Sequence, residues 1–176
     1  GRRSHSRQQM ALANKAIGTP GSAPRRLMEK TVGIAAERLL PPYARQRFST
    51  WFKRRRSAGT TVTPVAEARG RHETAVLFPT CIVEYQAPEV GHDLVKVCER
   101  NGISCELPEG QVCCGAPWLH SGDVDRFVAQ GKKNVAVLAQ ALREAGPDAT
   151  VVVPQPTCSY VLKKDYVDYV GGADAE

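Results

Sequence analysis

Six cysteines are the residues of this sequence best suited to chemistry, and four of them share a context. Each of the four lies beside proline or glycine, in Pro79-Thr80-Cys81, in Cys113-Cys114-Gly115-Ala116-Pro117 and in Pro154-Gln155-Pro156-Thr157-Cys158. Proline and glycine fix tight turns and let a backbone approach a bulky inorganic ligand closely. Four thiolates are the ligand set of both structural zinc and iron–sulfur clusters. We therefore expect Cys81, Cys113, Cys114 and Cys158 to bind a metal cofactor.

The adjacent pair, Cys113 and Cys114, distinguishes between these cofactors. Neighbouring thiolates fit one tetrahedral ion awkwardly, whereas they can reach different iron atoms of a cluster. The sequence therefore favours an iron–sulfur cluster, of the 4Fe-4S type, with zinc as the alternative. A disulfide between the two neighbours would close a strained ring, so metal binding is favoured over it.

The other candidate site residues receive plainer interpretations. Cys98 falls on an apolar helix face and Cys105 within a strand, and buried thiols behave as small hydrophobic groups. His120 is expected to be a solvated loop residue, with metal ligation or proton relay as the alternatives. Trp118 is expected to pack over the site and limit its access to solvent.

The elements that must position the four thiols alternate along the second half of the chain. Short apolar runs predict strands at residues 75–78, 103–107 and 150–153, and apolar stripes predict helices at residues 88–101, 123–146 and 159–169. This order predicts an α/β fold, a small three-layer β-α-β-α-β unit with a parallel sheet and right-handed crossovers. Each of the four thiols follows a strand, so the carboxyl edge of the sheet would bring them together. Helix amino termini beyond the loops would direct N–H groups at the negative sulfurs.

Charge divides the chain into two parts. Residues 1–75 carry sixteen Lys and Arg against four Asp and Glu, whereas residues 76–176 carry eight against fourteen. We predict a flexible basic segment over residues 1–23, because turn residues at 18–24 cannot continue a helix. A helical connector is predicted over 24–56, with apolar stripes at 28–39 and 44–52, followed by a linker over 57–74. We predict that residues 75–176 form the cysteine-rich domain and that the residues before them form its basic helical extension.

The basic run Lys53-Arg54-Arg55-Arg56 leaves several interpretations open. A run of like charge is most often a solvated face or a linker, and docking to a partner subunit is the next interpretation. Contact with an anionic membrane surface and binding of nucleic acid are the alternatives. Nucleic acid is the least favoured partner, because the charge run alone supports it.

Composition excludes several classes of protein. With 42% hydrophobic and 24% charged residues, the chain is not collagen-like, disulfide-dense or wholly disordered. No run approaches the roughly eighteen apolar residues of a transmembrane helix. The basic first residues lead into no apolar stretch, which argues against a secretory signal and for a reducing compartment. We expect a cytoplasmic location, which includes peripheral attachment to the inner face of the membrane.

Residues 77–166 resemble the cysteine-rich domain family named for its Cys-Cys-Gly motif, which occurs in the B subunit of heterodisulfide reductase and its relatives. Within this family, the likeness is strongest to the iron–sulfur C subunit of anaerobic glycerol-3-phosphate dehydrogenase. The matching residues are Pro79-Thr80-Cys81, Asn101-Gly102, Gln111-Val112-Cys113-Cys114-Gly115-Ala116-Pro117, Gly122, Asn134, and Pro156-Thr157-Cys158 followed by Leu162-Lys163-Lys164-Asp165-Tyr166. Residues 33–52 are similar to the helical connector that such subunits place after a ferredoxin-like module.

The resemblance implies an iron–sulfur electron-transfer subunit. Its implied partners are a flavin-containing dehydrogenase subunit, a membrane quinone-linked subunit, a ferredoxin-like module and a second Cys-Cys-Gly unit. No general acid, general base or nucleotide loop is recognisable, so an oxidoreductase subunit without substrate turnover of its own is expected. The alternative is a zinc-bound or metal-free structural or interaction module of a larger redox complex.

The sequence departs from the family pattern in three ways. It has no Cys-x-x-Cys-x-x-Cys run, so the ferredoxin clusters are missing, and it has one cysteine-rich unit where the family usually has two. Val161 stands where heterodisulfide reductase has the second cysteine of a Cys-x-x-Cys pair. This last departure argues against a five-thiolate noncubane cluster and against disulfide reduction. The chain therefore resembles an interior piece of a longer subunit, or a reduced relative.

Overall fold

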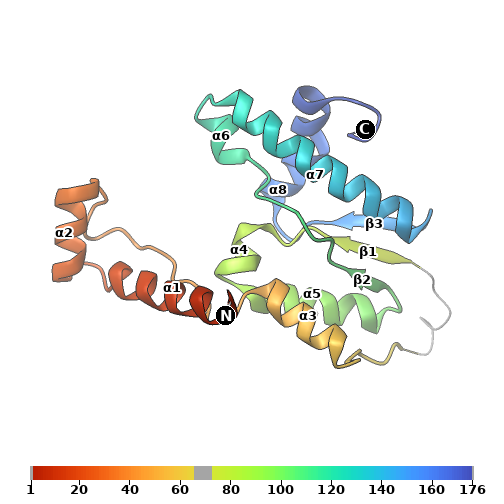
Figure 1. The fold of residues 1–176 in the computed structure, drawn as a ribbon, viewed down its shortest axis with the longest axis horizontal. Helices are drawn as coiled ribbons and strands as arrows, with labels where there is room; N and C mark the ends of the chain where they lie inside the picture. Colours follow the sequence, from red (N-terminus) through yellow and green to blue (C-terminus); the bar gives the residue numbers. More distant parts are fainter. Residues whose placement is uncertain (1, 66–72, 176) are drawn as a thin grey trace.

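The computed structural model describes residues 2–65 and 73–175 (Figure 1). The linker expected over 57–74 therefore lies partly outside the described residues. Three parallel strands form the centre of the molecule: β1 (Thr74–Leu77), β2 (Ser104–Glu106) and β3 (Ala149–Val152), in the order β2-β1-β3. Thr74 of β1 pairs with Ser104 on one side and with Ala149 on the other. The predicted parallel α/β arrangement is confirmed.

The central strand is apolar on both faces, because each face is covered by a separate core. Val76 and Phe78 pack into one cluster of buried side chains, and Ala75 and Leu77 pack into the other. A strand that is buried on both faces reads as a continuous apolar run rather than an alternating one. This explains why residues 75–78 carry no polar side chain.

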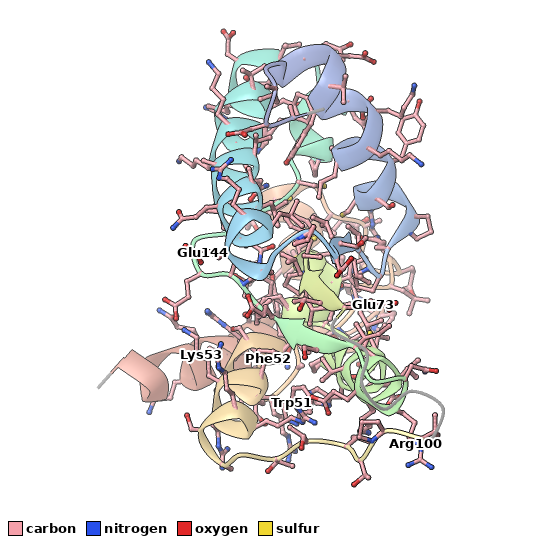
Figure 2. All side chains as sticks on the ribbon, turned by 90° about the vertical axis from the view of Figure 1, so that its right-hand side faces the viewer. Trp51, Phe52, Lys53, Glu73, Arg100 and Glu144 are labelled. Atoms are coloured by element: carbon pink, nitrogen blue, oxygen red, sulfur yellow. The ribbon has the colours of Figure 1, made fainter. Side chains whose placement is uncertain are left out.

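Helices cover both faces of the sheet and complete three layers (Figures 1 and 2). On one face lie α3 (Phe48–Ser57) and α5 (Pro88–Arg100), and on the other lie α7 (Val124–Ala145) and the π-helix η2 (Val161–Val170). Figure 2 shows Trp51, Phe52 and Lys53 of α3 on the opposite side of the sheet from Glu144 at the end of α7. Three shorter helices follow the strands: α4 (Thr80–Tyr85), α6 (Ala116–His120) and α8 (Pro156–Tyr160).

The two long helices begin and end close to where the sequence predicts. The side chain of Asp123 caps α7 by accepting a hydrogen bond of 3.2 Å from the backbone N–H of Arg126. Pro88 opens α5 at a position where its missing N–H costs no hydrogen bond. The C-terminal helix differs from the expectation for 159–169, because α8 continues directly into η2. In η2 the hydrogen bonds span five residues, as in the bond of 3.0 Å from the N–H of Gly171 to the carbonyl of Tyr166.

The N-terminal region differs from the sequence prediction in its helix boundaries. Helix α1 (Arg2–Ile17) lies in the segment expected to be flexible, and the sequence analysis did not predict it. Helix α2 (Ala23–Val32) begins earlier than expected and ends before the predicted limit at 39. Gly33 ends it with a φ of 75°, a left-handed conformation in which its N–H bonds back to Glu29. The second connector helix, α3, begins at Phe48, so the four residues before it are not helical.

The pair α1 and α2 projects away from the sheet (Figure 1). Arg25 of α2, which is 1% exposed, joins this helix to the chain that follows it, because its guanidinium donates to the carbonyls of Ala35, Ala36 and Arg38. Asn14 joins α1 to the chain that leads into α3, through two hydrogen bonds of 2.8 and 2.7 Å with the backbone of Tyr43. No helix in the described part of the chain is both long and apolar enough to cross a bilayer.

Candidate functional site

The four predicted site cysteines lie in the three connections that leave the carboxyl ends of the strands. Cys81 lies in α4 directly after β1, Cys113 and Cys114 lie between β2 and α6, and Cys158 lies in α8 after β3. Because the strands are parallel, these connections leave the sheet at one edge. The connections on the two sides of the central strand β1 run over opposite faces of the sheet. In open α/β sheets, ligands commonly bind at such a switch point.

The structure brings all four thiols together. The thiol of Cys114 donates a hydrogen bond of 3.3 Å to the sulfur of Cys158. Cys113 shares side-chain hydrogen bonds with Cys114 on one side and with Cys81 on the other. The four sulfurs thus lie close together, with Cys81 exposed and with Cys114 and Cys158 only 3% and 4% exposed.

Contact between the sulfurs shifts their pKa values in opposite directions. Burial and the neighbouring charge of Cys113 raise the pKa of Cys81, and the hydrogen bond with Cys114, together with burial, raises the pKa of Cys113. The hydrogen bond from Cys114 lowers the pKa of Cys158. Four sulfurs this close cannot all lose their protons without a compensating positive charge. A bound cationic metal centre would provide that charge.

Backbone N–H groups at the start of α6 also face the sulfurs. Hydrogen bonds from the N–H groups of Gly115 and Ala116 favour the ionised forms of Cys113 and Cys114, respectively, and so act to lower the pKa of each thiol. Gly115 has a φ of 89°, and a Cβ at this position would lie 2.8 Å from the ring of Phe127. Glycine is therefore needed directly after the cysteine pair, both for the backbone conformation and for space.

A buried Asn–Tyr pair holds the backbone of the cysteine pair in place. Asn134 on α7 is 0% exposed, and its amide accepts from the N–H of Val112 at 2.9 Å and donates to the carbonyl of Cys113 at 3.2 Å. It also donates to the hydroxyl of Tyr166, which in turn donates to the carbonyl of Cys114, each at 2.9 Å. Both residues match the family pattern in the sequence, but their spacing did not indicate this role.

Three glutamines support the site, and sequence reasoning missed them. The amide of Gln111 donates to the carbonyl of Leu77 at the end of β1, at 3.0 Å. The side-chain oxygen of Gln155 accepts from the thiol of Cys158 at 3.2 Å. Gln130, in the amide orientation that its neighbours require, donates to the carbonyl of Cys113 at 3.1 Å. Gln111 and Gln155 lie two and three positions before a site cysteine, but their residue type alone did not indicate a supporting role. Gln130 reaches the carbonyl of Cys113 only through the packing of α7.

The structure places the remaining candidate residues outside the group of four thiols. Trp118 packs against α7, with the guanidinium of Arg126 5.0 Å from its ring centre, and its indole N–H donates to Gln130. His120 is exposed at the end of α6. Val161 is 1% exposed and packs in the same core as Cys114 and Cys158.

The four thiols can be compared with the ligand sets of two kinds of metal site. In the described part of the chain, no three His, Cys, Asp or Glu side chains are grouped so as to hold one metal ion. A structural zinc ion requires four ligands at about 2.0–2.3 Å from a single point. A polynuclear cluster instead presents several iron atoms, each of which needs its own thiolate.

Residues 75–163, about half of the chain, match the protein family described as "Cysteine-rich domain" (CCG). The chain belongs to this family. The match begins in β1 and ends in η2, so it includes the sheet and all three connections that carry the thiols. The family assignment made from the sequence is thereby confirmed. No solved structure matches the chain.

Curated relatives include subunits of oxidoreductases. The chain is 28% identical to the C subunit of anaerobic glycerol-3-phosphate dehydrogenase from Escherichia coli K12, over 81% of this chain and 33% of the relative. It is 35% identical to the B subunit of fumarate reductase (CoM/CoB) from Methanothermobacter marburgensis, over 52% of this chain and 17% of the relative. It is 32% identical to an iron–sulfur protein of Methanocaldococcus jannaschii, over 51% of this chain and 17% of the relative. The chain thus spans at most about a third of the length of these relatives.

Proposed function

We propose that this chain is an iron–sulfur electron-transfer subunit, or part of one, in which Cys81, Cys113, Cys114 and Cys158 hold one 4Fe-4S cluster. The observation that carries the proposal is the contact between four thiols that come from three separate connections of the sheet. An all-cysteine ligand set is the usual one for such clusters. The name of the relative from Methanocaldococcus jannaschii, an iron–sulfur protein, supports the same cofactor.

The residues of the chain would serve the cluster in different ways. A bound cluster supplies one-electron exchange. Cys114 and Cys158 are buried and exclude water from one side of the site, whereas Cys81 is exposed. Electrons would therefore enter or leave on the side of Cys81. Asn134 and Tyr166 hold the backbone of the cysteine pair in place and so limit how far the two sulfurs can move.

The proposed partners follow from the names of the relatives, which are subunits of dehydrogenases and reductases. We infer a flavin-containing dehydrogenase subunit as the electron donor and a quinone or another carrier as the acceptor. A ferredoxin-like module and a second Cys-Cys-Gly unit would complete the chain of clusters. The place of action would be the cytoplasm or the inner face of its membrane, where thiols remain reduced.

Iron and acid-labile sulfide analysis of protein purified without oxygen tests the proposal, together with an electron paramagnetic resonance spectrum. We expect a brown protein with about four irons per chain, as one cubane requires, and loss of colour in air. A colourless preparation that holds one zinc ion after anaerobic reconstitution would contradict the proposal and support a structural module instead.

A further inference from the structure

A second pair of thiols meets on the other side of the sheet from the core of the first site. Cys98 lies in the last turn of α5 and Cys105 lies in β2, and their side chains share a hydrogen bond. Both pack with the cluster of buried side chains around Phe48 and Val95, whereas Cys114 and Cys158 pack with the other cluster. The two groups of thiols are therefore separate, and the sequence-based view of Cys98 and Cys105 as unrelated packing residues omits their contact.

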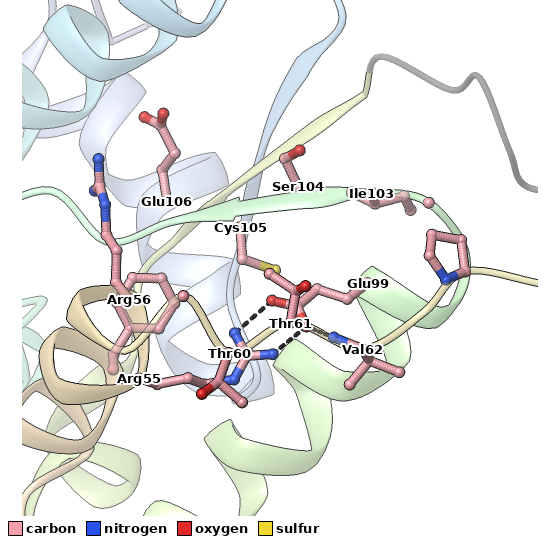
Figure 3. Close-up of a pocket in the computed structure, with 14 residues that line it drawn as sticks. Arg55, Arg56, Thr60, Thr61, Val62, Glu99, Ile103, Ser104, Cys105 and Glu106 are labelled. Atoms are coloured by element: carbon pink, nitrogen blue, oxygen red, sulfur yellow. Dashed lines mark hydrogen bonds and ion pairs between the residues drawn. The ribbon is translucent and has the colours of Figure 1, made fainter.

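One thiol of this pair borders a cavity. A pocket of about 420 Å³ lies between β2 and the extended segment at residues 59–64, and Cys105 is among the residues that line it. Figure 3 shows the sulfur of Cys105 directed toward α5, above the ion pair of Arg55 and Glu99. Cys98 is 8% exposed and is not among the residues that line the pocket. A small molecule in the pocket would thus meet Cys105 first.

We propose that Cys98 and Cys105 form a second thiol site, which oxidises reversibly to a disulfide by exchange with a low-molecular-weight disulfide that enters this pocket. The proposal is independent of the cluster at the other four cysteines. It rests on three observations: the contact between the sulfurs, the burial of one thiol and the position of the other in the wall of a cavity. These are the features of a pair in which one thiol attacks and the other resolves.

The reaction balances without any further reactant. The thiolate of Cys105 attacks one sulfur of the low-molecular-weight disulfide, RSSR. This attack forms a mixed disulfide and releases RS⁻, to which Cys98 gives its proton. The Cys98 thiolate then attacks the mixed disulfide, and the second RS⁻ leaves and takes a proton from water. Two protein thiols are oxidised to one disulfide, and one RSSR is reduced to two RSH.

The electrostatics of the pair favour a thiolate at neutral pH. The hydrogen bond from Cys105 lowers the pKa of Cys98 to about 7, and the same bond, with burial, raises the pKa of Cys105. The pair therefore shares one proton, and its transfer along the hydrogen bond places the negative charge on either sulfur. The positive charge of Arg55 acts to lower the pKa of Cys105, the residue that lines the pocket, and the negative charge of Glu99 acts more strongly to raise it.

Differential alkylation after treatment of the folded protein with oxidised glutathione tests the proposal. We expect peptide mapping by mass spectrometry to find Cys98 and Cys105 protected and joined to each other, and dithiothreitol to restore alkylation at both. In Cys98→Ser the resolving thiol is missing, so Cys105 should retain a glutathione adduct. A variant in which the other four cysteines are changed to serine should form the same bond, which separates this result from any result on the cluster.

The test also has clear contrary outcomes. The proposal is wrong if both cysteines stay fully open to alkylation in the folded protein, or if they pair only after urea has been added. Thiol mapping of Cys105→Ser provides a matched variant, in which buried Cys98 should acquire the adduct much more slowly than Cys105 does in Cys98→Ser. Equal rates in the two variants would show that the pocket does not direct the exchange.

Discussion

Convergence of four thiols from three connections of the sheet is the feature that distinguishes the predicted site cysteines from the pair Cys98 and Cys105. Cys114 and Cys158 are 3.3 Å apart at their sulfurs, and Cys113 joins them to Cys81. Ligation requires convergent thiolates, whereas packing requires only a small apolar group. The role of each cysteine can therefore be tested by one substitution at a time.

We predict that serine at any one of Cys81, Cys113, Cys114 and Cys158 removes or converts the cluster. A hydroxyl is a poor ligand for iron and leaves a coordination position open to solvent. Iron content and the paramagnetic resonance spectrum of anaerobically reconstituted protein measure the effect. Alanine at Cys98 or Cys105 is the control and should preserve the spectrum at a cost of about 1 kcal/mol in stability. Equal iron in Cys114→Ser and wild type, or loss of iron in folded Cys98→Ala, would show that the ligands are assigned wrongly.

The hydroxyl of Tyr166 connects the core to the cysteine pair. It lies in a buried position, donates to the carbonyl of Cys114 and accepts from Asn134. Its removal leaves the carbonyl of Cys114 short of one donor, whereas the amide of Asn134 keeps the carbonyls of Val112 and Cys113 as acceptors. An unsatisfied buried group costs about 1–3 kcal/mol.

We therefore predict that Tyr166→Phe lowers the free energy of unfolding by about 1–3 kcal/mol and makes a bound cluster more labile to air. Urea titrations followed by circular dichroism measure the first effect, and the rate of bleaching measures the second. Tyr169→Phe is the matched control, because Tyr169 is 48% exposed and its ring contacts Phe127 edge-on. That change should stay within about 0.5 kcal/mol of wild type. Identical values for both variants would exclude the proposed role of the Tyr166 hydroxyl.

Among the elements, α3 shows how the basic region is attached to the cysteine-rich domain. Its Phe48 and Phe52 are 1% and 6% exposed and pack with Val95 of α5 and Leu77 of β1. The side chain of Glu84 in α4 adds a cap, since it accepts hydrogen bonds from the N–H and the hydroxyl of Ser49 at 2.9 and 2.7 Å. Helix α3 is thus part of the fold and covers one face of the sheet.

We predict that Phe48→Ala lowers the free energy of unfolding by about 3–5 kcal/mol, because it removes a large aromatic side chain from a core. The four site thiols should still bind their cofactor in the fraction that remains folded, since three of them, Cys113, Cys114 and Cys158, pack on the opposite face. Chemical denaturation and iron content, measured on the same sample, separate the two effects. Lys53→Ala on the same helix is the control, because its ion pair with Glu109 is exposed and screened by solvent, so its loss should leave stability close to that of wild type. A loss of less than about 1 kcal/mol in Phe48→Ala would mean that α3 does not stabilise the domain.

At the scale of the whole molecule, the charge division follows the architecture. The basic residues concentrate in α1, α2, α3 and their connections, and the acidic part contains the strands and all six cysteines. The chain also covers only a third of the glycerol-3-phosphate dehydrogenase relative that it matches. Turnover of an organic substrate would need a general acid, a general base or a nucleotide loop, and none of these is recognisable in the sequence.

We predict that the purified chain, with its cofactor bound, transfers electrons but turns over no organic substrate. Reduction of a redox dye by a chemical donor should proceed, whereas glycerol 3-phosphate and other hydroxy compounds should give no reduction, because hydride chemistry needs a flavin or nicotinamide cofactor. Dye assays without any second protein measure this. Substrate-dependent reduction of the dye by the chain alone would contradict the prediction.

The sequence by itself determined the parallel sheet and the family, and it indicated the four cysteines that the structure brings together. These follow from local signals: apolar runs of strand length, helix caps such as Asp123, and proline or glycine beside each thiol. It did not determine α4 and α6, which at six and five residues are too short to show a helical period. The sequence also predicted the end of α2 too late, because the helical spacing of apolar residues continues past Gly33, whereas the helix itself ends at Val32.

Only the tertiary structure decided which side chains meet. Asn134 contacts Val112 across 22 positions of sequence, and Tyr166 contacts the carbonyl of Cys114 across 52. The contact of Cys98 with Cys105 likewise depends on how α5 packs on β2. Spacing along a chain records the period of one helix or strand, but it carries no information on the distance between two elements. That distance is set when apolar faces pack, and the packing gives six similar thiols two different environments.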